Sequence, residues 1–237
     1  MRGRRKPLAI VLPFIILAVF IHIFVPVQHV PWRKLNMDAP VGMATGTKIS
    51  LITLGSDAKC MDMLASADAL KFELAEPKHA GEVCGWKSAA ILQTAAGISF
   101  RPEEVTGQCP LLVAGYIWLG EVDRLAKKYL GSPLKRVHHA GTYACRRQKG
   151  NSSDEWSEHA FANAWDITGF ELEDGQMISV LNDWNGPKSR EARKKAEFLR
   201  KTRKSACGLF HVVLSPDYNA AHKDHLHLDQ GPSSYCQ

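Results

Sequence analysis

The chain contains 237 residues, enough for one ordinary globular domain and an additional segment. Hydrophobic residues make up 45% and charged residues 23% of the sequence, which is the composition of a folded protein rather than a disordered one. Of the net charge of +6, four units come from Arg2, Arg4, Arg5 and Lys6. Because the remainder is only weakly basic, we expect no nucleic-acid partner.

An uncharged apolar run of 20 residues extends from Leu8 to Val27. At about 1.5 Å per residue, a helix of this length crosses the hydrocarbon core of a bilayer. We therefore predict a cytoplasmic basic tail over 1–7 and a single-pass anchor over 8–27 in the inner (cytoplasmic) membrane, with the remainder in the periplasm or otherwise outside the membrane. A cleaved signal peptide is the alternative, and it also exports the domain.

Six cysteines are present, and an even number in an exported chain indicates disulfides. We expect at least two disulfides to form. Sequence alone does not choose among the pairings, although Cys145 with Cys207 is the favoured pair. Cys145 lies beside Arg146, and Cys207 opens the strand that leads to a cluster of histidines.

Residues 28–56 are rich in proline and glycine and are predicted to be a linker, which would reach about 25 Å as a flexible coil. A helix is expected next over 57–70, followed by a turn over 81–85. A strand is then expected over 89–94 and a long helix over 109–130. The last of these is the clearest, because its apolar residues recur at helical spacing and Gly131 follows it.

In the second half we expect a hairpin, a strand, a helix and two further strands. The hairpin is placed over 135–139 and 142–146, and the strand that follows it over 164–170. The helix is placed over 188–204 and the two further strands over 210–214 and 225–229. The helix over 188–204 is interpreted as amphipathic with a solvated basic face, and contact with anionic lipid or wall polymer is the alternative. The mixed order predicts an α+β domain over 57–237, with a small mixed or antiparallel sheet flanked by helices.

Histidines and an aspartate form the most informative pattern. His159 and Asp166 are seven positions apart, and His222, His225 and His227 lie within six residues. Side chains alternate along a strand, so His225 and His227 are expected on one face. Two imidazoles and one carboxylate suit a hydrolytic zinc site, which keeps a position open for water and needs a nearby base.

The spacing His159-x6-Asp166 followed by His225-x-His227 resembles the signature of zinc peptidases that cut peptidoglycan peptides. These include the D-alanyl-D-alanine peptidases, whose wider pattern S-x-H-x-x-G-x-A-x-D is matched except that Ala162 replaces the glycine, and the penicillin-insensitive murein endopeptidases. More closely, the stretch from about Cys60 to Asp229 resembles the bacterial extensin-like carboxy-terminal domain family.

This resemblance implies a role for each residue of the pattern. The implied zinc ligands are His159, Asp166 and His227. The implied catalytic residues are His225 as general base or transition-state stabiliser, His222 as its assistant, and Arg146 as a binder of the substrate carbonyl or carboxylate. Asp224 and Asp229 are candidates for orienting the imidazoles.

Together these features predict a zinc-dependent hydrolase that cleaves peptide amide bonds in peptidoglycan, with endopeptidase cleavage favoured over carboxypeptidase trimming. The alternative is an inactive, zinc-stabilised wall-binding module. A metal carrier and a metal-free structural wall protein explain the histidine cluster less well. The expected partners are peptidoglycan peptides and, through the N-terminal anchor, the membrane.

Overall fold

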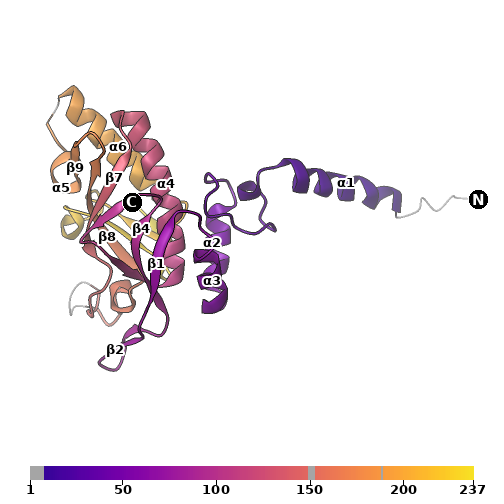
Figure 1. Cartoon of the computed structure of the whole chain (residues 1–237), viewed down its shortest axis with the longest axis horizontal. Helices are drawn as coiled ribbons and strands as arrows, with labels where there is room; N and C mark the ends of the chain where they lie inside the picture. The colour runs from indigo at the N-terminus through magenta and orange to yellow at the C-terminus, as the bar shows by residue number, and fades with distance from the viewer. Residues whose placement is uncertain (1–7, 149–152, 188) are drawn as a thin grey trace, which may run out of the picture.

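The computed structural model describes residues 8–148, 153–187 and 189–237 and confirms an α+β architecture (Figure 1). The helices are α1 (Leu8–Phe24), α2 (Thr45–Thr53), α3 (Asp57–Leu64), α4 (Cys109–Leu130), α5 (Val180–Asp183) and α6 (Arg190–Ala206), with 3-10 helices η1 (Val27–His29), η3 (Glu158–Phe161) and η4 (Ala220–His222). The strands are β1 (Leu70–Ala75), β2 (Lys78–Ala80), β3 (Cys84–Trp86), β4 (Ala89–Ala95), β5 (Ser99–Arg101), β6 (Val105–Gly107), β7 (Leu134–Gly141), β8 (Ala164–Leu172), β9 (Met177–Ser179), β10 (Val212–Leu214), β11 (Leu226–Asp229) and β12 (Tyr235–Cys236).

The largest sheet has seven strands in the order β12-β10-β11-β8-β7-β5, with β9 also paired to β8. Its centre, β11-β8-β7, is antiparallel, whereas the outer pairs β5·β7 and β10·β12 are parallel. A three-stranded antiparallel sheet, β1-β4-β6, and the hairpin β2-β3 complete the strands. The sheet is therefore mixed, as expected, and its central strand β8 is paired along both edges.

Helix α4 forms the centre of the core and has the bounds predicted from its periodicity. Its buried side includes Trp118, which is fully buried in the hydrophobic core. Gly115 allows the Trp165 ring of β8 to approach, because an added Cβ would lie 3.2 Å from that ring. Gly131 ends the helix in the left-handed conformation at φ 82°. Strand β8 is thus held directly against α4.

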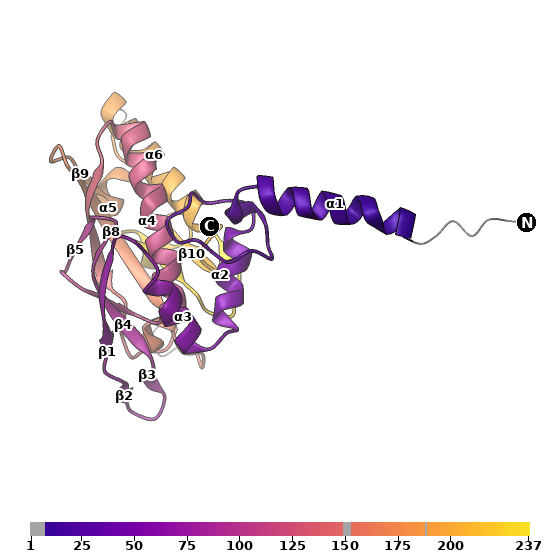
Figure 2. The ribbon, with the colours of Figure 1, turned by 45° about the vertical axis from the view of Figure 1, so that its right-hand side comes forward.

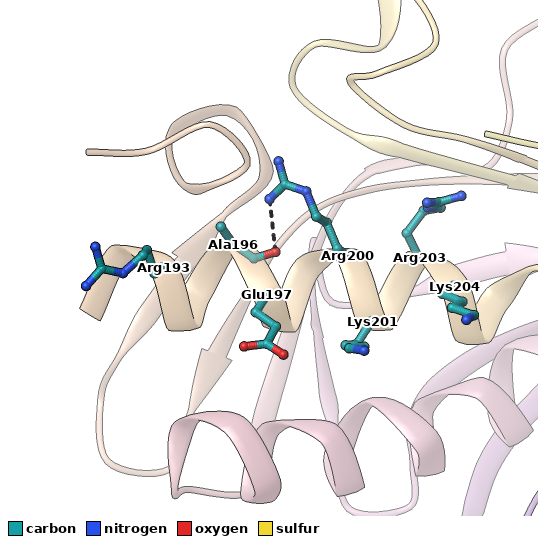
Figure 3. A pocket seen from close by; sticks show the side chains of 7 residues that line it. All are labelled: Arg193, Ala196, Glu197, Arg200, Lys201, Arg203 and Lys204. Atoms are coloured by element: carbon teal, nitrogen blue, oxygen red, sulfur yellow. Dashed lines mark hydrogen bonds between the residues drawn. The ribbon is translucent and has the colours of Figure 1, made fainter. Parts of the chain in front are cut away.

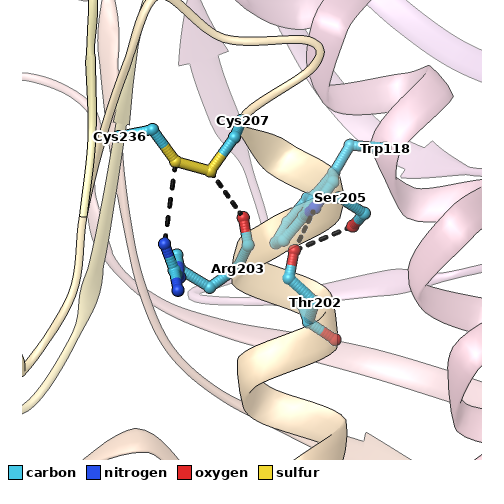
Figure 4. Close-up of a disulfide and its surroundings, with 6 residues drawn as sticks. All are labelled: Trp118, Thr202, Arg203, Ser205, Cys207 and Cys236. Atoms are coloured by element: carbon cyan, nitrogen blue, oxygen red, sulfur yellow. Dashed lines mark hydrogen bonds between the residues drawn. A yellow bond between two sulfur atoms is a disulfide. The ribbon is translucent and has the colours of Figure 1, made fainter.

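Helix α6 packs against α4 and matches the predicted amphipathic segment, beginning at Arg190; Lys188 lies outside the described residues. Ala192 and Leu199 are buried, and the exposed side carries a row of basic side chains (Figure 3). The Trp118 indole donates a 3.2 Å hydrogen bond to the Thr202 carbonyl oxygen (Figure 4). Apolar burial on one face and solvation of the other explain the helix.

Three disulfides join Cys60 to Cys109, Cys84 to Cys145 and Cys207 to Cys236, so the expectation of at least two is confirmed. The favoured pairing of Cys145 with Cys207 is wrong. Parallel pairing of β10 with β12 brings the C-terminus back to the end of α6 and supplies Cys236 to Cys207 (Figure 4).

The predicted hairpin over 135–139 and 142–146 is also wrong in its second half. Strand β7 continues to Gly141 and pairs with β8, and the described residues 142–146 form no strand. Residues 142–147 pair instead with the segment around η3, through the bonds Ala144 N to His159 O and Ser157 N to Arg146 O. The conformation of residues 142–147 is thus determined by hydrogen-bond partners that are distant in sequence, which local periodicity does not reveal.

Several other predictions hold with shifted boundaries. The strands expected over 89–94, 164–170, 210–214 and 225–229 correspond to β4, β8, β10 and β11. The turn expected over 81–85 connects β2 to β3, although residues 84 and 85 already belong to the strand. The helix expected over 57–70 ends at Leu64, because the next residues form turns that lead into β1.

The segment over 28–56, expected to be a linker, is folded onto the domain. It contains α2, which packs against α4, and Ile49 and Met37 belong to the main hydrophobic core. The reach of a flexible coil therefore does not apply to this segment.

Helix α1 projects from the rest of the chain, and its side chains from Val11 to Phe24 are largely exposed (Figure 1). Within the described residues, no helix has both the length and the apolar character needed to cross a membrane. The basic tail predicted over 1–7 lies outside the described residues.

Candidate metal centre

Two of the predicted ligands face each other across the centre of the sheet. His227 on β11 is the direct partner of Asp166 on β8 in the antiparallel register. Directly opposite residues on neighbouring strands project from the same face, so their side chains meet. His227 Nδ1 lies 2.9 Å from Asp166 Oδ1. The register of β8 against β11 therefore creates this half of the centre.

The third predicted ligand, His159, comes from the short helix η3. Ser157 caps this helix by accepting a hydrogen bond from His159 N, and Ala162 ends it in the left-handed conformation at φ 52°. Ala162 stands where the resembling pattern has glycine, and an alanine in this conformation costs about 1–2 kcal/mol. The His159 ring donates from Nδ1 to the Thr142 carbonyl oxygen at 3.2 Å, which directs Nε2 toward Asp166.

These three residues, the ligand set, offer atoms that all lie within 4.8 Å of one another. His159 Nε2 is 3.1 Å from Asp166 Oδ2 and 3.3 Å from His227 Nδ1. Ligand atoms around a tetrahedral zinc, each about 2.0–2.2 Å from the ion, are separated by roughly 3.3 Å. The spacing and the chemistry of this donor set therefore fit a single zinc ion.

Charge interactions within the ligand set are strong. Burial opposes the charged form of Asp166, but hydrogen bonds from His159 and His227 outweigh it and hold the pKa of the carboxyl far below its usual value. Burial likewise opposes the charge of His227, but bonds to Asp166 and Asp229 outweigh it and raise its pKa to about 9. The ligand set thus pairs a carboxylate whose pKa is lowered with an imidazole whose pKa is raised.

Asp229 and Glu158 lie behind the ligand set. Asp229 Oδ2 is 2.9 Å from His227 Nε2, and its Oδ1 accepts a hydrogen bond from Gly231 N. This arrangement holds the His227 ring with Nδ1 toward the metal position, the orienting role considered for Asp229. Burial raises the pKa of Glu158, although a 2.7 Å hydrogen bond from Asn163 opposes the shift.

The predicted catalytic residues, the rim set, are Arg146, His222 and His225. The His225 imidazole lies with Nε2 3.6 Å from Asp166 Oδ1, and its Nδ1 is 2.8 Å from Asp224 Oδ1. His225 precedes β11 rather than belonging to it, yet it approaches Asp166 from the same side as His227. Asp224 is thus the orienting partner that had been considered for it.

His222 belongs to η4 and is held by Asn219, whose Oδ1 is 2.8 Å from His222 Nδ1. Its ring centroid is 5.1 Å from that of His225 and 5.9 Å from that of His227. Burial, and then the charges of these two histidines, lower the pKa of His222 to about 4. His222 is therefore a neutral imidazole near pH 7.

Arg146 is exposed on the loop that follows β7, and its charge also acts on His222. Its neighbour Cys145 is bonded to Cys84 of β3, which connects this loop to the β2-β3 hairpin. Tyr143 lies in the same loop against the Trp86 ring, at a centroid distance of 5.2 Å. The structure thus brings His222 and His225 beside the ligand set and places Arg146 near enough for its charge to act on His222.

Sequence reasoning missed two contributors. The Thr142 carbonyl oxygen sets the orientation of His159, and no sequence signal marks it because every residue has a carbonyl group. Tyr218 packs its ring edge-on against His222 at 5.5 Å. It lies only four residues before that histidine, so its position in the motif was the available signal.

The fold and the site define an α+β domain in which β8, β11 and η3 bring together three residues that could hold one metal ion. Among known families, the one described as "Extensin-like protein C-terminus" matches residues 58–237. The chain therefore belongs to the extensin-like C-terminal family, as its sequence predicted. No curated protein and no solved structure matches the chain.

Proposed function

We propose that the domain is a zinc-dependent hydrolase that cleaves peptide amide bonds in peptidoglycan, with D,D-type endopeptidase action on crosslinks. The observation that carries this proposal is the arrangement of the ligand set with a fourth side chain, His225, 3.6 Å from Asp166. A site that served only to hold zinc for stability has no need of a base beside its ligands.

A zinc ion held by the ligand set would polarise the substrate carbonyl and lower the pKa of a water molecule to about 7. His225 has the placement of a general base, because Asp224 holds its Nδ1 and leaves Nε2 facing the ligand set. His225 would accept the proton of the attacking water and return it to the departing amine as the amide C–N bond breaks.

Arg146 and His222 are proposed to position the substrate. The guanidinium of Arg146 is exposed beside the site, and it suits a planar carbonyl or carboxylate group. His222, a neutral imidazole, adds a hydrogen-bonding group next to His225. The cluster His222-x-x-His225-x-His227 favours endopeptidase action, whereas Arg146 also suits the terminal carboxylate that a carboxypeptidase binds.

The proposed location is outside the cytoplasm, with α1 associated with the inner membrane. Three disulfides that use all six cysteines support an oxidising compartment. The apolar side chains exposed along α1 support association with lipid.

The decisive experiment incubates the full chain with purified sacculi and with defined crosslinked muropeptide dimers, with zinc and with a chelator. We expect chelator-sensitive conversion of dimers to monomers, and His225→Ala with bound zinc should be inactive. Release of terminal D-alanine alone would assign carboxypeptidase action. No change in any muropeptide, together with retained binding to sacculi, would identify the zinc-stabilised binding module.

A further inference from the structure

Helix α2 has an apolar face that no described part of the chain covers. Its buried face, which includes Lys48 and Ile49, packs toward α4. On the opposite side Leu51 and Leu54, together with Met43 just before the helix, are 56%, 82% and 86% exposed. Leu51 and Leu54 are three residues apart and so lie on one side of the helix, and Met43 is exposed in the turn that precedes it. A row of large exposed apolar side chains marks an interaction surface.

The start of α2 is attached directly to the end of α1. Ala44 N donates a 2.9 Å hydrogen bond to the Gln28 carbonyl oxygen, just after α1 ends. The buried Lys48 ammonium donates a 2.5 Å hydrogen bond to the Val27 carbonyl oxygen. Residues 25–54, here called the collar, therefore form a folded connection in which the α2 face lies beside the exit of α1.

The collar also holds the end of α1 itself. The Arg33 guanidinium donates hydrogen bonds to the carbonyl oxygens of His22 and Val25, at 3.2 and 3.5 Å. The neighbours of Arg33 on both sides are exposed: Trp32 is 62% exposed, and Lys34 also lies at the surface. A tryptophan beside basic residues at the end of an apolar helix is typical of the lipid headgroup region.

The position of α2 in the fold directs this face to the side of α1. In two views α2 lies between α1 and the body of the domain (Figures 1 and 2). Because one side of α2 packs against α4, its exposed side points away from that body. The apolar face of α2 thus lies on a side of the domain that α4 does not cover, and η1 joins the start of α2 to the end of α1.

We propose that the apolar face of α2 (Met43, Leu51 and Leu54), together with Trp32, lies in the headgroup layer of a lipid bilayer beside α1. The partner is a lipid surface with anionic headgroups, because Arg33 and Lys34 provide the complementary charge. The domain then rests on the membrane in a fixed orientation instead of moving freely on a flexible tether.

This orientation directs the metal centre away from the bilayer, an extension that rests on the proposed function. Trp165 of β8 points toward α4, because its ring lies against Gly115. Side chains alternate along a strand, so Asp166 points to the opposite face of the sheet. The metal centre therefore lies on the face of the sheet opposite α4, remote from α2.

The test uses the full chain bound to vesicles of phosphatidylglycerol and phosphatidylethanolamine. All six native cysteines form disulfides, so Met43→Cys introduces a single thiol for an environment-sensitive fluorophore. Met177→Cys is the matched control, because Met177 on β9 is also an exposed methionine, at 49%. We expect a blue shift at Met43→Cys and loss of its emission with headgroup-quencher lipid, and neither change at Met177→Cys.

A second variant strengthens the test. Leu51→Ser with Leu54→Ser should reduce the quenching at Met43→Cys while the circular-dichroism spectrum, which reports folding, stays unchanged. Equal solvent exposure of both probes on chains that float with vesicles would overturn the proposal, as would failure of the full chain to bind vesicles. Protection of the Met43→Cys probe without lipid would identify a second copy as the partner instead. These readouts need no hydrolysis, so they are independent of the peptidase proposal.

Discussion

The ligand set and the rim set are held by different kinds of structure. The ligand set is largely buried, and backbone pairing of β8 with β11 and the bond from His159 to the Thr142 carbonyl oxygen place its members. The rim set comes from a loop, a single 3-10 turn and the residue before a strand. The geometry of the ligand set is thus fixed by the central strands of the sheet, whereas the rim set depends on side-chain contacts within less regular segments.

The largest effect should follow removal of any member of the ligand set. We expect His159→Ala, Asp166→Ala and His227→Ala each to lose zinc and all zinc-dependent hydrolysis, because three protein ligands are the minimum for a catalytic zinc site. Metal analysis of the purified proteins provides the measurement. His79→Ala, an exposed histidine on β2, is the control that should keep its zinc. Normal zinc content in all three variants would remove the metal assignment.

His225→Ala should separate the two sets. We expect it to keep zinc and to lose about 10²- to 10⁴-fold in hydrolysis rate, the usual contribution of a general acid–base group. His222→Ala should lose less, because His222 lies beside His225 and His227 and is proposed to position the substrate rather than to transfer the proton. Loss of zinc from the His225→Ala protein would instead show that His225 is a ligand and that its role must be exchanged with that of His227.

Zinc affinity should weaken as the pH falls. His227 in the metal-free protein has a pKa of about 9, so below that pH its proton competes with the metal for Nδ1. From pH 9 to pH 7 we expect the apparent affinity to fall by about 100-fold, tenfold for each unit. Competition titrations with a chromophoric chelator measure this slope. An affinity that does not change over this range would mean that His227 does not compete with a proton for the metal.

Asp229→Asn should weaken the ligand set without removing a ligand. Asp229 orients the His227 ring through its Nε2, and loss of such a partner typically costs about 10- to 100-fold in metal affinity. The asparagine side chain keeps the size and leaves the Gly231 N hydrogen bond possible. Direct zinc titration checks the result, and an affinity equal to that of the unchanged protein would assign Asp229 no orienting role.

Arg146→Ala should give the smallest effect and should leave zinc binding unchanged. Loss of one hydrogen bond to a charged group, about 1.5 kcal/mol, corresponds to roughly a tenfold fall in kcat/KM. Arg147→Ala is the matched control, because the Arg147 guanidinium stacks over the Trp156 ring at 4.7 Å instead. An equal effect of the two substitutions on kcat/KM would argue against a substrate role for Arg146.

Much of this protein was determined by local sequence. The helix Cys109–Leu130 was predicted with its observed bounds, because burial of one face requires apolar residues at helical spacing and Gly131 supplies the C-terminal cap. The strands that carry Asp166 and His227 were also predicted. The spacing of the histidines and Asp166 singled out the ligand set, His222 and His225, whereas Arg146 was inferred from the family resemblance. Chemistry that depends on residue type and short spacing is visible in sequence.

Tertiary structure alone decided the rest. The pairing of Cys145 with Cys84 depends on the β2-β3 hairpin meeting the loop after β7, two segments far apart along the chain. The folding of residues 28–56 depends on α4 accepting Ile49 into its core. The orientation of His159 depends on the Thr142 carbonyl oxygen. In each case the stabilising contact joins residues that are distant in sequence or uses a main-chain atom common to all residues, so no local pattern encodes it.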